Sequence, residues 1–142
     1  MLISVNIWAV VLAMVGSMVV GSIWYAQGVF GRVWARLAKV DMTRNRGPIW
    51  QPLAVTAVVS TITAWVLASI TMLAYQYFQA TFLQDALMVG FWLWLGFTAA
   101  RLVTHDVFEG RPVKLTLLNA AHELVTITVM AAVIGLFGAP MD

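Results

Sequence analysis

The sequence predicts an all-α, polytopic membrane protein, with four transmembrane helices in a bundle and a short interfacial amphipathic helix between helices one and two. Of its 142 residues, 62% are hydrophobic and only 10% are charged, against about 45–50% and about 25% in soluble domains. No charged residue occurs within residues 1–31 or 47–84. Because one span takes about 20 residues, residues 1–142 have room for four spans in a single domain. The composition excludes a soluble globule and a disordered chain.

The predicted spans cover about residues 3–27, 52–76, 86–105 and 113–137. The first is longer than the apolar core of a signal peptide and has no basic residue before it, so we expect it to be retained. The second begins at Pro52, which helices tolerate in their first turn. A sharp turn around Gly110 and Pro112 makes the third and fourth spans antiparallel.

Basic residues predict the orientation of the bundle. The first connection carries Arg32, Arg36, Lys39, Arg44 and Arg46, the third carries Arg111 and Lys114, and the second carries none. Basic connections stay on the cytoplasmic side. The first and third connections are therefore expected inside, with both termini on the non-cytoplasmic side.

The first connection also contains the predicted amphipathic helix. Phe30, Val33, Trp34 and Leu37 recur at helical spacing, while Arg32, Arg36 and Lys39 fall largely on the opposite side. This pattern is typical of a helix on the inner leaflet whose basic residues bind anionic lipid head groups. We expect no nucleic-acid partner, because three charges on one helix are few.

Small residues mark the faces on which helices pack in lipid. In the first span Ala9, Ala13, Ser17 and Gly21 recur every fourth residue. The second span offers Thr56, Ser60, Ala64 and Ala68 at the same spacing, and the fourth offers Ala131, Gly135 and Ala139. These faces meet either within one bundle or between copies. A thin four-span bundle also favours assembly into a homo-oligomer, first a dimer, or into a larger membrane complex.

Glu123 lies near the middle of the fourth span, where a carboxylate costs roughly 2.5–3.5 kcal/mol unless it is paired, protonated or hydrated. Thr116, Asn119, His122, Glu123 and Thr126 fall on one helix face, which must point away from lipid. Arg101, in the antiparallel third span, is expected level with about residue 117 or 118 and within reach of Asn119, His122 or Glu123.

Two interpretations of this intramembrane cluster stay open. In the first, an Arg101–Glu123 pair supported by an amide and an imidazole only locks the third and fourth spans together. In the second, the cluster lines a path for protons, ions or a small polar solute.

The predicted inner turn holds His105, Asp106, Glu109 and Arg111. Glu109 and Arg111 are placed to bridge the helix ends at the membrane surface. A metal site would need these groups to converge with His122, more than two helical turns away, so no metal is predicted. The chain has no cysteine and no catalytic or cofactor motif, so neither a catalytic residue nor a cofactor is predicted.

An ordered series of motifs along the chain resembles the bacterial membrane-protein family called domain of unknown function 1761. The motifs are Val5–Val10, Gly21 with Trp24–Tyr25, Phe30–Gly31, Trp34, Gly90–Phe97, Phe108–Pro112 with Lys114–Leu115, and Asn119–His122. The resemblance implies a four-helix protein of the bacterial inner membrane. It implies no reaction, since the family has no assigned activity.

Three functions are compatible with the sequence. The first is a structural or accessory subunit that packs through its small-residue faces, which the lack of a catalytic motif favours. The second is a small proton-linked transporter or channel that uses Arg101, Asn119, His122 and Glu123. The third and least favoured is an intramembrane enzyme or cofactor binder.

Overall fold

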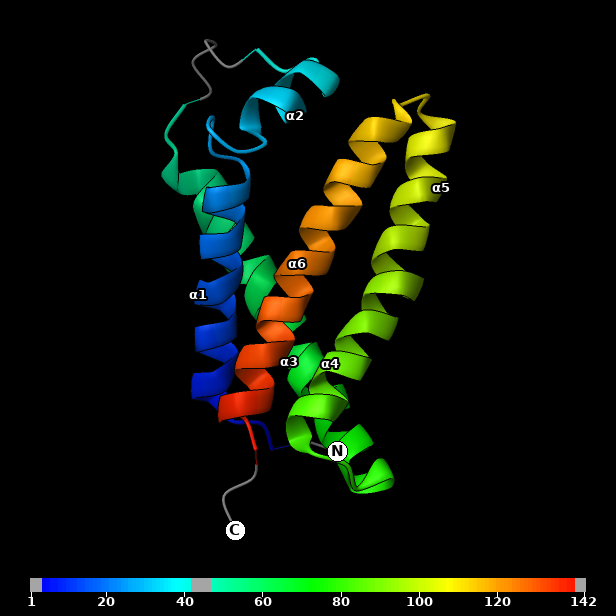
Figure 1. Ribbon diagram of the computed structural model, residues 1–142. Helices are drawn as coiled ribbons and strands as arrows, with labels where there is room; N and C mark the ends of the chain where they lie inside the picture. Colours follow the sequence, from blue (N-terminus) through cyan, green and yellow to red (C-terminus); the bar gives the residue numbers. More distant parts are fainter. Residues whose placement is uncertain (1–3, 42–46, 140–142) are drawn as a thin grey trace.

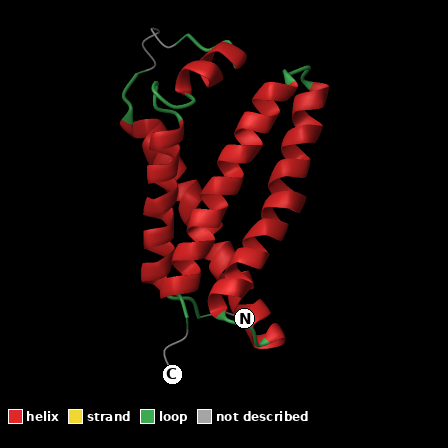
Figure 2. Ribbon diagram, in the orientation of Figure 1, coloured by secondary structure: helices red, strands yellow, loops and turns green. Residues whose placement is uncertain are grey.

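The computed structural model describes residues 4–41 and 47–139, and the regular structure in that part of the chain is helical (Figure 2). The elements are α1 (Ile7–Trp24), α2 (Gly31–Leu37), α3 (Trp50–Phe78), α4 (Phe82–Leu93), the π-helical segment η1 (Trp94–Ala99), α5 (Ala100–Phe108) and α6 (Val113–Phe137). Four segments are long and apolar enough to cross a membrane: α1, α3, the continuous run Phe82–Phe108, and α6. The predicted polytopic helical bundle is confirmed. Ile3, Arg44 and Arg46 lie outside the described residues.

Side-chain caps set the helix starts that hydropathy alone misplaces. α1 begins at Ile7 because the Asn6 side chain accepts hydrogen bonds from the backbone nitrogens of Trp8 (3.0 Å) and Ala9 (3.4 Å). α4 begins four residues before the predicted span. There Thr81 and Gln84 form a capping box, in which each side chain accepts a hydrogen bond from the other's backbone nitrogen. The bounds of α6 coincide with the fourth predicted span.

The two ends of the bundle differ (Figure 1). α2 and the α5–α6 turn lie at one end, while the start of α1, the α3–α4 turn and the end of α6 lie at the other. At that second end the Asn6 side chain donates a hydrogen bond to the carbonyl oxygen of Phe137 (2.9 Å). α6 packs against both α1 and α4 and is therefore the central helix.

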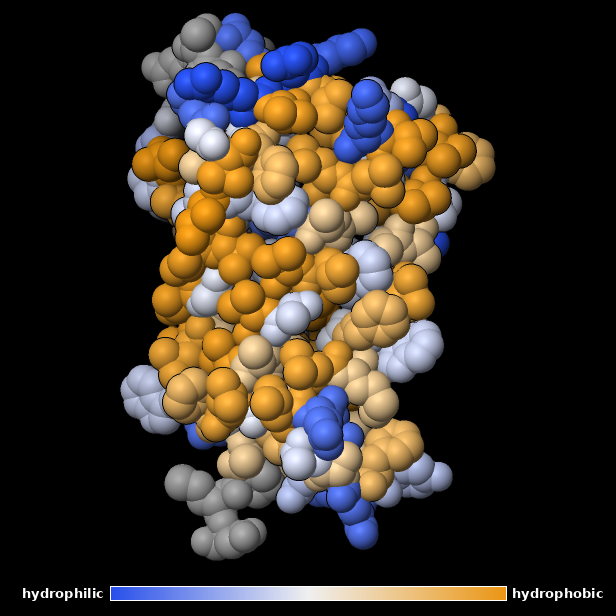
Figure 3. Space-filling model, viewed as in Figure 1, coloured by the Kyte–Doolittle hydropathy of each residue, from blue (hydrophilic) through white to orange (hydrophobic). Residues whose placement is uncertain are grey.

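The tightly packed core occupies the half of the bundle near the termini. Its fully buried members include Val10, Ala13, Ala64, Leu67, Ala86, Met130, Ala131 and Ile134. Many are alanines, as expected where helices approach closely in lipid. The face seen in Figure 3 carries a broad apolar band between more polar ends, which matches the surface of a membrane-spanning protein.

Gly135 of α6 lies very close to Leu83 of α4. A Cβ atom at this position would lie 2.7 Å from the Cα atom of Leu83, so the helices would have to separate. We expect Gly135→Ala to lower the free energy of unfolding in detergent by about 1–2 kcal/mol, because overpacking exceeds the gain in helix propensity. Gly96→Ala is the matched control, since a Cβ atom there meets nothing within 4 Å. Equal stability of the two variants would contradict this account.

Candidate functional site

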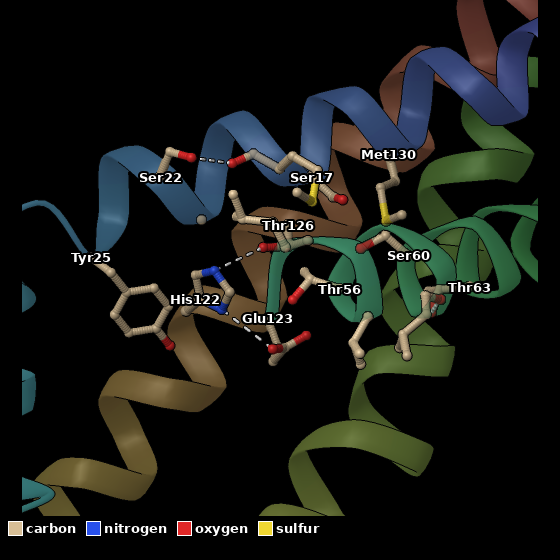
Figure 4. A pocket seen from close by; sticks show the side chains of 15 residues that line it. Ser17, Ser22, Tyr25, Thr56, Ser60, Thr63, His122, Glu123, Thr126 and Met130 are labelled. Carbon is tan, nitrogen blue, oxygen red and sulfur yellow. Dashed lines mark hydrogen bonds and ion pairs between the residues drawn. The ribbon is translucent and has the colours of Figure 1, made fainter. Parts of the chain in front are cut away.

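A cavity of about 490 Å³ lies between α1, α3 and α6, in the half of the bundle near α2 (Figure 4). We call it the α1–α3–α6 cavity. Its polar lining consists of Ser17, Ser22, Tyr25, Thr56, Ser60, Thr63, His122, Glu123 and Thr126. Its apolar and glycine lining consists of Met18, Gly21, Leu53, Val55, Val59 and Met130. The cavity brings three of the predicted cluster residues, His122, Glu123 and Thr126, to one wall.

These three side chains form a short polar chain along α6. His122 Nδ1 lies 3.3 Å from Glu123 Oε1, and His122 Nε2 lies 3.4 Å from Thr126 Oγ1. The His122 side chain is 12% exposed, whereas that of Glu123 is 45% exposed. The imidazole is therefore enclosed, and the carboxylate is the member of the chain that a small molecule in the cavity can reach.

Aromatic rings from the end of α1 enclose His122. The ring centroids of Trp24 and Tyr25 lie 5.7 Å and 4.9 Å from that of the imidazole. Trp24 also packs on Phe30 (4.5 Å), and Tyr25 packs on Trp34 of α2 (5.4 Å). Nothing in the spacing of Trp24 and Tyr25 along the sequence shows that they contact His122.

The hydroxyl groups around the cavity are largely committed as donors. Ser22 donates to the carbonyl oxygen of Met18 (2.8 Å), Thr56 to that of Pro52 (2.8 Å), and Thr63 to that of Val59 (3.1 Å). Ser17 donates to Met14 in the same way (2.7 Å). A hydroxyl group that already donates its hydrogen to a backbone carbonyl oxygen can only accept further hydrogen bonds.

Arg101 does not join this site, which corrects the expected Arg101–Glu123 pair. Its side chain is exposed and makes no hydrogen bond or ion pair within the part of the chain that the structure describes. The π-helical segment η1 ends two residues before Arg101, and the extra residue in a π turn rotates all later side chains about the helix axis. In the same segment, Trp94 Nε1 donates a hydrogen bond to the carbonyl oxygen of Ala120 on α6 (2.9 Å). Asn119 also stays apart from the polar chain, and its buried Oδ1 has no hydrogen-bond partner among the described residues.

Polar side chains connect α5 to α6 near the inner turn, in addition to the packing of α4 and η1 on α6. Asp106 is 5% exposed, and its Oδ2 accepts a hydrogen bond from Thr116 Oγ1 on α6 (2.7 Å). Arg111 Nε lies 3.8 Å from Asp106 Oδ1 and 2.5 Å from Glu109 Oε2. His105 is exposed. The groups of the inner turn therefore link α5 to α6 and stand apart from the cavity.

The remaining predicted residues lie as follows. Ala9, Ala13 and Ser17 are buried, and a Cβ atom on Gly21 would lie 3.8 Å from His122 Nε2. Arg32, Arg36 and Lys39 are exposed on and beside α2. Among the residues described, no group of three histidine, cysteine, aspartate or glutamate side chains is placed to hold a metal ion.

Two features of the molecule were not predicted from the sequence. Thr56, Ser60 and Thr63 of α3 line the same cavity as Glu123, although spacing suggested only a packing face for the first two. Asp85, in the first turn of α4, is 2% exposed, and its Oδ2 has no hydrogen-bond partner within residues 4–41 and 47–139. The sequence placed Asp85 in the connection between the second and third predicted spans, so its burial was not predicted.

Comparison with known proteins places the chain in a family. The model of the family described as "Protein of unknown function (DUF1761)" matches residues 8–135. No curated protein and no solved structure matches the chain. The matched region runs from the start of α1 almost to the end of α6, so it includes the α1–α3–α6 cavity and nearly all of the four candidate spans. The chain therefore belongs to the DUF1761 family of proteins of unknown function.

Proposed function

We propose that this protein is a small proton-linked transporter of the bacterial inner membrane, with the α1–α3–α6 cavity as its solute site. The observation that carries the proposal is a glutamate–histidine pair that opens on a hydroxyl-lined cavity inside the span region. Ionisable groups within spans are retained where they have a function or a partner. Glu123 has no basic partner besides His122 among the described residues, and its carboxylate faces the cavity.

The shape of the bundle supports transport over a purely structural role. The cavity lies in the half near α2, while the other half is closed by Val10, Leu67, Met130 and Ile134, each at most 1% exposed. A cavity confined to one half of the bundle, with a closed core in the other half, is what one state of an alternating-access cycle requires. The accessory-subunit hypothesis accounts for the helix contacts and leaves the cavity unexplained.

The proposal includes an orientation. The basic residues of the first and third connections favour the cytoplasmic side for the end that carries α2, with both termini on the other side. The cavity then lies in the cytoplasmic half of the bilayer. Attachment of α2 to anionic lipid head groups and assembly into a dimer or a larger complex stay predictions.

Reconstituted vesicles test the proposed function. Vesicles loaded with a low-molecular-mass filtrate of bacterial cytosol supply solutes without a choice of substrate, and an internal dye reports pH after an external pH step. We expect Glu123→Gln to slow the internal pH change at least about tenfold, because glutamine keeps the shape but cannot carry the proton. Glu109→Gln in the inner turn is the matched control and should behave as the wild type. Wild-type vesicles no faster than protein-free vesicles would overturn the proposal.

A further inference from the structure

We propose that the α1–α3–α6 cavity binds a small organic ammonium ion, with the ammonium group on Glu123 and the organic part on the apolar wall. This inference rests on the proposed function and names the class of its substrate. Charge, hydrogen bonding and the apolar lining each support it.

The charge of the lining favours a cation. Glu123 is the acidic group of the cavity, and no lysine or arginine lines it among the described residues. His122 is held between Glu123 and Thr126, so its ring nitrogens already have partners. An anion would meet a carboxylate and no fixed positive charge, which is costly where water is scarce.

The hydrogen-bonding groups favour a donor. The hydroxyl groups of Ser22, Thr56 and Thr63 donate hydrogen bonds to helix carbonyl oxygens, so they offer only lone pairs to the cavity. An ionised carboxylate also only accepts. The wall is therefore rich in acceptors, and an ammonium group with up to three N–H bonds complements it. The Tyr25 ring adds an aromatic surface of the kind that attracts cations.

The apolar lining favours an organic cation over a metal ion. Leu53, Val55, Val59 and the methionines Met18 and Met130 form much of the wall. The volume of about 490 Å³ lies within the range of about 300–1,000 Å³ that is usual for small-molecule sites. A bare alkali ion would leave most of that apolar wall without contact, whereas an alkylammonium ion covers it.

Calorimetry on the purified protein in detergent tests the inference with n-butylammonium, n-butanol, butyrate and K⁺ as probes. We expect butylammonium to bind about tenfold more tightly than butanol, because one charge-assisted hydrogen bond changes the dissociation constant by about this factor. Glu123→Gln should remove this difference, whereas Glu109→Gln should retain it. Thr56→Val keeps the shape and removes one acceptor, so it should weaken butylammonium binding several-fold in a protein whose folding is confirmed by circular dichroism.

Other outcomes would overturn the inference. Butyrate or K⁺ binding as tightly as butylammonium would do so, as would butylammonium binding equally to the wild type and to Glu123→Gln. The vesicle experiment separates this result from the proposed function. Glu123-dependent proton movement without butylammonium binding rejects the ammonium class alone, and binding without proton movement rejects transport alone.

Discussion

Replacing Asp106 by alanine is expected to lower the free energy of unfolding by about 3 kcal/mol, roughly two orders of magnitude in the folding equilibrium. Asp106 is buried and accepts the hydrogen bond of Thr116, which is 7% exposed. Without the carboxylate, the Thr116 hydroxyl group stays buried and has lost its hydrogen-bond acceptor. Arg111 also loses one of the two carboxylates near its guanidinium group. Unfolding by a denaturing detergent, followed by circular dichroism, measures the change.

Companion variants separate this contact from general disruption. Asp106→Asn keeps an oxygen that can accept from Thr116, so it should recover at least half of the loss. In a double-mutant cycle, adding Thr116→Val to Asp106→Ala should cost little more, because both changes remove the same bond. Arg101→Ala should change stability by no more than about 0.5 kcal/mol, as for other exposed sites. A larger loss of stability for Arg101→Ala than for Asp106→Ala would support the Arg101–Glu123 pair that the sequence predicted.

Hydropathy and turn residues were enough to predict the spans, because lipid imposes a simple requirement on length and composition. The helical period was also enough to place His122, Glu123 and Thr126 on one face of α6. The bounds of α1 and α4 depend instead on caps, in which Asn6 and Thr81 act at single positions. Such local hydrogen bonds outweigh the hydropathy of the flanking residues.

The neighbour of Glu123 could not be predicted from the sequence. Sequence order suggested the third span, since an antiparallel turn joins it to α6. Yet η1 changes the side-chain register before Arg101, and the polar chain of α6 faces α1 and α3 instead. Thr56 and Ser60 did recur at a packing spacing, but a small hydroxyl residue suits both a helix contact and a cavity wall. Only the three-dimensional arrangement distinguishes these uses.

A lysine in place of Ser60 is expected to be tolerated in the wild-type background and to cost about 3 kcal/mol of stability when Glu123 is glutamine. Ser60 lines the cavity from α3, and Glu123 lines it from α6. A lysine there brings its own ammonium group into the site. With the carboxylate present the two charges pair, whereas without it an unpaired ammonium lies deep in the membrane at about 2.5–3.5 kcal/mol.

Ile62→Lys is the matched control, because Ile62 lies on the same helix, is 58% exposed and does not line the cavity. Ile62→Lys should lower the stability equally with glutamate or glutamine at position 123, so the coupling free energy between the two substitutions should be near zero. The Ser60→Lys protein should also lose butylammonium binding, since a tethered ammonium has an effective concentration in the millimolar range or above. Equal costs of Ser60→Lys with and without the carboxylate would mean that Glu123 does not attract a cation across the cavity. The ammonium inference would then fail, while a role of Glu123 in proton transfer would still be decided by the vesicle experiment.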